Sequence, residues 1–124
     1  MLAGGDYSKL AGGDYSKLAG GDYSMLAGGN SSMLAGGDSS KLAGGNSSML
    51  AGGNSSMLEI GTGGIAVGDK NSKAKGKIGA CIVLCERDSN YKLTKVVAKI
   101  IDGKKIKEDT WYELKGGKFV EVKN

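Results

Sequence analysis

The chain of 124 residues contains no histidine and no proline, and only 6% of its residues are aromatic. Histidine is the commonest general base and metal ligand, so its absence removes the usual centre of a catalytic or metal site. What remains for catalysis is a scatter of Asp, Glu and Lys residues. We therefore expect a protein that is not an enzyme and that holds no cofactor and no metal ion.

Long apolar runs are missing as well, and no segment approaches the length needed to span a bilayer. The sequence opens Met-Leu-Ala-Gly-Gly-Asp, without the basic and apolar stretches of a secretory signal. We expect no membrane span and synthesis in the cytoplasm, with a final place in a phage particle or in an extracellular fibre.

Cysteine is scarce, and the two cysteines, Cys81 and Cys85, are four residues apart in an apparent strand. Their Cα atoms would be about 13 Å apart at the rise of an extended chain. That separation is too long for a disulfide between them. We expect reduced, buried thiols, which fit synthesis inside the cell.

Charge is unevenly divided. Residues 1–58 carry three Lys against four Asp, whereas residues 59–124 carry fourteen Lys or Arg against nine Asp or Glu. The basic half is compatible with weak attraction to an anionic surface. Its lysines alternate with acidic and apolar residues, which favours solvated strand faces over a nucleic-acid interface.

A strict repeat fills the first half of the chain. Seven octads of the form Leu-Ala-Gly-Gly-(Asp/Asn)-(Tyr/Ser)-Ser-(Lys/Met) run from Leu2 to Met57 without an insertion. A flexible Gly/Ser linker is the alternative reading. A linker has no reason to keep Leu and Ala in strict phase, whereas a stacked core does.

The length of the repeat constrains its geometry. Eight extended residues measure about 26 Å, too short a ring to enclose side chains, while sixteen measure about 53 Å and form two strands about 10 Å apart. We therefore predict coils of two octads. Gly-Gly-(Asp/Asn) is the expected corner, because glycine supplies positive φ. Alternation directs Ser8 and Leu10 inward, with Tyr7 and Lys9 outward, and the inward hydroxyl needs a partner such as the Ser or backbone one coil away.

The repeat continues in worn form. Adding sixteen to Ser56 and Leu58 gives Ser72 and Ala74, so residues 59–66 and 67–74 are two further octads. Nine octads predict an all-β protein, a β-solenoid of about 4.5 two-strand, 16-residue coils over residues 1–76. Residues 77–124 are predicted as a capping domain, an antiparallel β-meander with strands near 77–87, 91–101, 110–114 and 118–122. Its face of Ile78, Ala80, Ile82 and Leu84 could pack on the last coil.

The variable positions suggest where the molecule meets others. Asp tends to accompany Lys and Asn to accompany Met within an octad, which suggests charge balancing on stacked surfaces. Tyr7 and Tyr23 are expected on one side and Tyr15 on the other, while Met-bearing faces would expose apolar ladders. Because the repeat begins at full quality, we expect an open first coil. The candidate self-association residues are Met1, Leu2, Tyr7, Tyr15, Tyr23, Met25, Met33, Met49 and Met57.

Other motifs are weaker. Gly-Gly-Asp resembles calcium-binding nonapeptide repeats, but the period here is eight and Asn replaces Asp in three units. Gly61-Thr-Gly-Gly64 lacks the strand–loop–helix setting of a phosphate loop. The cysteine pair lacks further zinc ligands, and Trp111 with Tyr112 is typical of cap core and rim.

The octads, paired into sixteens, resemble the repeats of bacterial ice-nucleation proteins, without their outward Thr-x-Thr array. The whole chain is similar to gut-bacterial and phage-associated octapeptide-repeat proteins. That similarity is carried by Ser72-Lys-Ala-Lys-Gly76, Ile78-Gly-Ala-Cys-Ile-Val-Leu84 and Asp109-Thr-Trp-Tyr-Glu-Leu114. It implies a β-solenoid with a small cap of unknown function, and it transfers no catalytic residues.

Two functions follow as expectations. The first is a structural protein that associates with itself, as a fibre or a capped oligomer, by β-augmentation at the open coil. The second is a binding or adhesion module, such as a phage-tail or cell-surface element, whose stacked faces contact a glycan, an anionic surface or ice.

Overall fold

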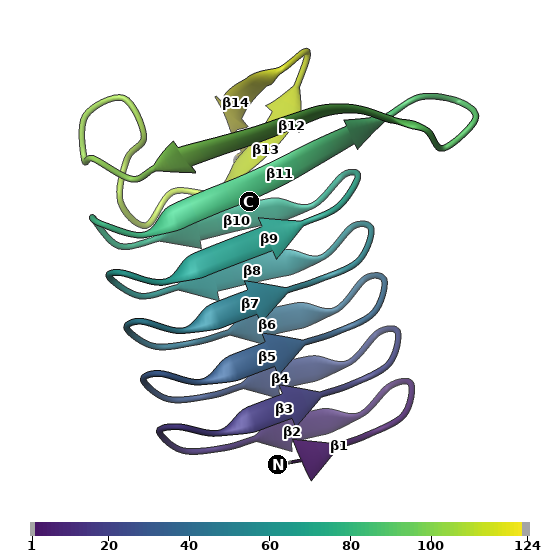
Figure 1. Cartoon of the computed structure of the whole chain (residues 1–124), viewed down its shortest axis with the longest axis vertical. Helices are drawn as coiled ribbons and strands as arrows, with labels where there is room; N and C mark the ends of the chain where they lie inside the picture. Colours follow the sequence, from purple (N-terminus) through teal and green to yellow (C-terminus); the bar gives the residue numbers. More distant parts are fainter. Residues whose placement is uncertain (1, 123–124) are drawn as a thin grey trace.

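The computed structural model describes residues 2–122, and every regular element in that range is a β-strand. The strands form two seven-stranded sheets that pack face to face, and the chain alternates between them to make the coils of a solenoid (Figure 1). The first sheet runs β1 (Leu2–Ala3), β3 (Lys17–Ala19), β5 (Met33–Ala35), β7 (Met49–Ala51), β9 (Ile65–Gly68), β11 (Cys81–Arg87) and β12 (Leu93–Ile100). The second runs β2 (Lys9–Ala11), β4 (Met25–Ala27), β6 (Lys41–Ala43), β8 (Met57–Ile60), β10 (Lys73–Gly76), β13 (Tyr112–Lys115) and β14 (Lys118–Glu121).

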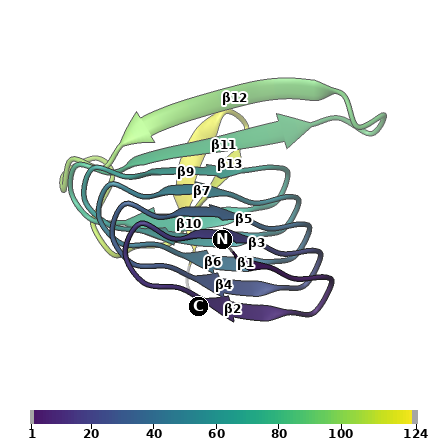
Figure 2. The ribbon, with the colours of Figure 1, turned by 60° about the horizontal axis from the view of Figure 1, so that its bottom comes forward.

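The register confirms the coil predicted from the octads. Leu2 pairs with Leu18 and Leu10 with Leu26, each sixteen residues apart in parallel strands. The worn octads hold the same phase, because Leu50 pairs with Ala66 and Leu58 pairs with Ala74. Consecutive odd and even strands make about five coils, close to the expected four and a half (Figure 2).

The interior is a column of Leu and Ser side chains, as the alternation predicts. Leu26, Leu34, Leu42 and Leu50 are each 2% exposed, and Ser40 is fully buried. The Ser hydroxyls donate mainly to the carbonyl three residues earlier in the same coil, as from Ser40 to Gly37 at 2.7 Å. The expected contact one coil away is present further along the array, as between Ser32 and Ser48 at 3.3 Å. The buried hydroxyls are therefore satisfied without water.

The corners differ from the prediction. Glycine was expected to take positive φ, but in the repeat this conformation belongs to the sixth octad position, including Tyr7 at 61° and Ser47 at 56°. Each strand of the octads is correspondingly short, three residues in most coils. Tyr7, Tyr15 and Tyr23 lie in turns instead of strands.

The glycines of the octad are needed because there is no space for a side chain, and not because the backbone takes a positive φ there. A Cβ on Gly36 would lie 2.6 Å from the Ser40 hydroxyl, inside the coil. A Cβ on Gly37 would overlap the Asp22 side chain and lie 2.9 Å from the Asp22 nitrogen, in the coil beneath. Side chains larger than hydrogen at either place would push the coil apart.

The Asp and Asn residues of the octad connect the coils. Asp22 N–H donates to the Asp6 carboxylate at 2.8 Å, and Asn46 N–H donates to the Asn30 side-chain oxygen at 2.9 Å. Asp and Asn serve equally because both present an acceptor oxygen. Within residues 2–122 no ion pair joins a lysine of the octads to one of these aspartates. Backbone bonding therefore explains the ladder, and the charge balancing expected within octads stays a prediction.

The C-terminal strands form a cap of two hairpins, not one continuous meander. β11 pairs in parallel with β9 and antiparallel with β12, so this hairpin extends the first sheet. β13 pairs antiparallel with β10 and with β14, so the other hairpin extends the second sheet. The solenoid ladder thus continues into β11, beyond the boundary expected at residue 76. The difference arises because a two-sheet solenoid has two sheet ends to cover.

The apolar face expected for the cap is largely present. Ala80 and Ile82 are fully buried and Leu84 is 1% exposed, beside Ile101 and Tyr112. Ile78 is instead 50% exposed, because it precedes the turn at Gly79 and lies outside β11.

Candidate functional site

The first coil is the end of both sheets in the described part of the chain. β1 and β2 pair on one side only, with β3 and β4. Burial is lower here: Ser8 and Leu10 are partly exposed, whereas Ser24 and Leu26 one coil on are 1% and 2% exposed. Of the two predicted residues at this end, Leu2 begins β1 and Met1 lies outside the described residues.

The backbone of this coil shows what an added strand would meet. In later coils the N–H at the eighth octad position donates to a Ser carbonyl of the coil before, as from Met25 to Ser8 at 2.9 Å. The N–H of Gly21 likewise donates to Gly5 O at 3.2 Å. By the same repeat, the N–H groups of Gly5 and Lys9 point out of the first coil. The edge can therefore accept a strand by main-chain bonding.

The three tyrosines are exposed at the two corners. Tyr7 and Tyr23 lie one coil apart with ring centroids 5.1 Å apart and planes 5° from parallel. Tyr15 lies on the opposite corner and is 82% exposed. The predicted division of the tyrosines is therefore confirmed, although they project from turns.

The methionines divide between two unlike faces. On the first sheet one outward column contains Lys17, Met33, Met49, Ile65 and Cys81. On the second sheet the equivalent column alternates: Lys9, Met25, Lys41, Met57 and Lys73. Only the first sheet has a continuous apolar ladder, so the expectation of apolar ladders on the Met-bearing faces holds for one face of two.

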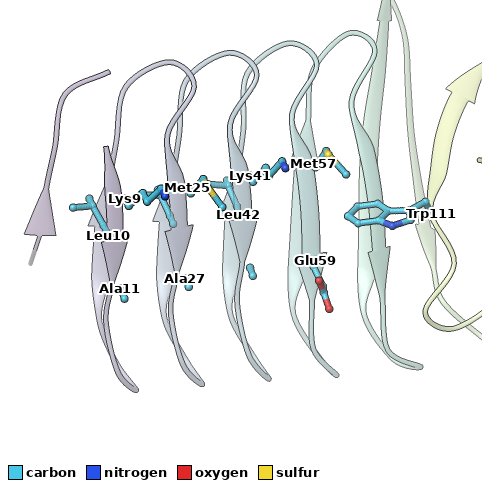
Figure 3. Close-up of a pocket in the computed structure, with 12 residues that line it drawn as sticks. Lys9, Leu10, Ala11, Met25, Ala27, Lys41, Leu42, Met57, Glu59 and Trp111 are labelled. Atoms are coloured by element: carbon cyan, nitrogen blue, oxygen red, sulfur yellow. The ribbon is translucent and has the colours of Figure 1, made fainter. Parts of the chain in front are cut away.

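Grooves run along both faces beside these columns. The groove of the second sheet has a volume of about 410 Å³, and alanines of successive coils line it beside the column that includes Met25 and Lys41. Trp111 closes its cap end (Figure 3). Lys75 Nζ lies 4.9 Å from the indole centroid, a cation–π distance. Trp111 is thus a rim residue and Tyr112, 2% exposed, a core residue; the sequence placed the pair in the cap core and rim without assigning which residue takes which place.

The cap is fastened to the solenoid by charged contacts. Arg87 Nε and Nη2 donate to the two Asp69 oxygens at 2.7 and 3.0 Å, and the guanidinium lies 4.5 Å from the Tyr91 ring centroid. The hydrogen bonds from Arg87 lower the pKa of Asp69. Lys77 pairs with Asp109 at 2.8 Å on the surface. Sequence reasoning missed this contact, because Asp69 and Arg87 are 18 residues apart and no motif links them.

The two cysteines are free and only partly buried, so the prediction of reduced thiols agrees with the structure while full burial does not. Burial, with the nearby Asp69 carboxylate, raises the pKa of the Cys85 thiol. Across residues 2–122 no three His, Cys, Asp or Glu side chains gather as a metal site. The same range contains no helix that is long and apolar enough to cross a membrane.

Comparisons with protein families, with curated proteins and with solved structures find no match to this chain.

Proposed function

We propose that this is a non-enzymatic structural protein that associates with itself through its first coil. The observation that carries the proposal is the difference between the two ends of the solenoid. β1 and β2 end their sheets with one side unpaired, while the other end is covered by β12 and by the β13–β14 hairpin (Figure 1). In the described residues β12 and β14 also leave one side unpaired, but each belongs to an antiparallel hairpin that ends the solenoid ladder. The first coil instead presents the same short strands by which successive coils already pair, which favours association at that end.

The mechanism is β-augmentation between two first coils. Each coil binds the next through backbone bonds of about the same length, such as Gly4 N–H to Ala19 O at 2.8 Å and Tyr7 N–H to Asp22 O at 2.9 Å. A second copy supplies the partners that the first coil lacks on its outer side. Strand pairing also covers the partly exposed Leu10, which adds an apolar contribution.

A closed dimer is a better product than an open fibre. Head-to-tail growth would have to pair the short first-coil strands with β12 or β14, and β12 is eight residues long and belongs to a hairpin. Two identical first coils can instead meet about a two-fold axis, which is the commonest symmetry of homo-oligomers. The apolar column of Met33 and Met49, each about half exposed, is a lateral surface through which such dimers could associate further.

Glycine-to-alanine exchange tests the proposal. Among the described residues a Cβ on Gly5 or Gly13 meets nothing within 4 Å, whereas the equivalent Cβ on Gly21 lies 2.9 Å from the Asp6 backbone nitrogen in the coil beneath. The double variant Gly5→Ala, Gly13→Ala should fold normally and sediment as a monomer, because its methyl groups occupy the space of an added coil. The wild-type chain should sediment as a dimer.

The matched control is Met33→Lys, which changes the lateral face and should leave the dimer intact. A wild-type chain that stays monomeric at several hundred micromolar would overturn the proposal. So would a double variant that associates as strongly as the wild type. Electron microscopy of the same samples separates a closed dimer from a fibre.

The second candidate, an adhesion module, is favoured by the stacked and exposed Tyr7 and Tyr23 rings. Parallel aromatic rings offer apolar area with polar hydroxyl tips, as binding surfaces often do. Replacement of Tyr7, Tyr15 and Tyr23 by Ser should then abolish binding to a glycan array while sedimentation is unchanged. Retained binding by the triple variant would exclude the tyrosines as the contact.

A further inference from the structure

In the outward column of the second sheet the type of side chain repeats every two coils, whereas the backbone repeats every coil. Lys9, Met25, Lys41, Met57 and Lys73 are successive partners across parallel strands. A lysine therefore recurs at every second coil, with a methionine between. At about 4.8 Å per coil, the lysines repeat about every 9.6 Å.

A groove follows this column. Its other side is lined by Ala11, Ala27 and Ala43, which also pair coil to coil, and Glu59 and Trp111 lie at its cap end (Figure 3). The small alanines leave the backbone surface low beside the long Lys and Met side chains. The groove is thus open along the solenoid axis and is shaped for an extended chain.

The charge of the groove is positive. Lys9 and Lys41 line it with Glu59 as its acidic residue, and Lys73 continues the column toward the cap. Glu59 is itself approached by Lys75, at 4.0 Å. The two lysines against one glutamate favour an anionic occupant whose charges repeat at a spacing of two coils.

We propose that this groove binds a linear acidic polysaccharide that presents one carboxylate per disaccharide. One pyranose residue of an extended chain advances by about the height of one coil, so a disaccharide spans the two coils between lysines. The carboxylates meet the lysines, and the apolar faces of the sugar rings contact Met25 and Met57. Trp111 offers an aromatic surface to the terminal sugar, with the indole held by Lys75.

The spacing disfavours other chain molecules. Side chains on one side of an extended peptide repeat about every 6.8 Å, out of step with the lysines. Single-stranded nucleic acid is held by aromatic residues that stack on successive bases, and Trp111 is the single aromatic residue lining this groove. The groove begins on β2 of the first coil, at Lys9, Leu10 and Ala11. It lies on the outer face of the sheet, whereas self-association would use the backbone of the sheet edge, so binding in the groove does not require self-association.

The test uses the full chain with a hyaluronan hexasaccharide, which has three carboxylates on alternate sugars. Trp111 is the only tryptophan in the chain, so a change in intrinsic fluorescence reports binding at the cap end of this groove. The decisive variant moves one charge by one coil: Met25→Lys together with Lys41→Met. Net charge is unchanged, and both residues already occur at this octad position.

The swap should weaken binding about twofold to fivefold, the loss expected for one exposed ion pair. The same swap on the other sheet, Lys17→Met with Met33→Lys, should leave affinity unchanged. A neutral cello-hexaose should bind far more weakly than hyaluronan, and added salt should weaken hyaluronan binding. Equal affinity of the shifted variant, or equal binding of single-stranded DNA with the same charge, would show unspecific attraction to polyanions and overturn the proposal.

Discussion

The first glycine of each octad should be indispensable because of space, and Gly36 gives the sharpest test. In Gly36→Ala the new Cβ would lie 2.6 Å from Ser40 Oγ, 2.9 Å from Ser40 Cβ and 3.0 Å from Leu42 Cδ2. Ser40 and Leu42 are buried, and the Ser40 hydroxyl donates to Gly37 O at 2.7 Å. The methyl group has no room unless the serine moves and loses that bond.

The expected cost follows from these contacts. Overpacking of a well-packed interior costs about 1–3 kcal/mol, and loss of the buried hydrogen bond costs about 1 kcal/mol. Alanine gains roughly 0.5 kcal/mol through the lower entropy of its unfolded chain. The net loss is about 1.5–3.5 kcal/mol, which lowers the midpoint of thermal unfolding by roughly 5–15 °C. Circular dichroism of the β-sheet signal measures it.

A second substitution makes the prediction specific. Ser40→Gly in the same chain removes the atoms that clash, so the double variant should recover at least half of the loss. Gly37 O keeps hydrogen bonds from Gly53 N–H and from the Ser56 hydroxyl, so Ser40→Gly alone should be mild. Gly13→Ala is the control for backbone entropy and, in dilute monomeric samples, should gain about 0.5 kcal/mol, since its Cβ contacts nothing in the described residues. An unchanged midpoint for Gly36→Ala, or purely additive losses in the double variant, would refute the reasoning.

Four further predictions concern the ladders and the cap. Asn30→Asp should change stability by less than about 0.5 kcal/mol, because Asn46 N–H still finds an acceptor. Asn54→Asp should cost about 1–2 kcal/mol in the same unfolding assay, because Asn54 Oδ1 is buried without a partner and Lys70 N–H already donates to Asp69. Tyr7→Ser should lose about 0.5–1 kcal/mol by breaking the stack with Tyr23, while Tyr15→Ser, at the corner without a stacked ring, should lose less. Because the Asp69 pKa is held below its ordinary 3.8 in the folded chain, its stabilisation is complete above that pH and is lost as pH falls through the folded pKa. Unfolding midpoints measured from pH 6 to pH 2 should therefore fall less steeply for Asp69→Asn than for the wild type.

The repeat predicted the solenoid because a sixteen-residue coil is the shortest that encloses Leu and Ser side chains, and the register at Leu58 and Ala74 confirms it. The role of glycine could not be predicted in the same way. A glycine required for positive φ and a glycine required for space look identical in a sequence. Only the placement of Ser40 opposite Gly36, and of Asp22 beneath Gly37, separates the two cases.

The pairing of the cap strands could not be predicted from the sequence either. All four of its strands were recognisable from alternation and turn residues, yet their pairing was not. β12 and β13 are consecutive along the chain but extend different sheets, because the stretch between them crosses from one sheet to the other. Ile101 and Ile106, both buried, tie that crossing to the core. Which sheet end a hairpin covers depends on contacts such as Arg87 with Asp69, which link residues far apart in sequence.

The octad leaves little freedom, and that narrows where function can reside. Leu, Ser and both glycines are fixed by the interior and by the coil spacing. Where the fifth position presents an acceptor oxygen to the next coil, Asp and Asn are alternatives with little consequence for the fold; Asn54, whose Oδ1 has no partner, is the exception. Only the sixth and eighth positions vary freely, as Tyr or Ser at the corners and Lys or Met on the faces. Because octads alternate between sheets, one eight-residue repeat yields an apolar column on one face and an alternating Lys/Met column on the other. Changes at these two positions should therefore alter binding while the fold stays intact. Changes at Gly5 and Gly13 should alter assembly while both binding and the fold stay intact.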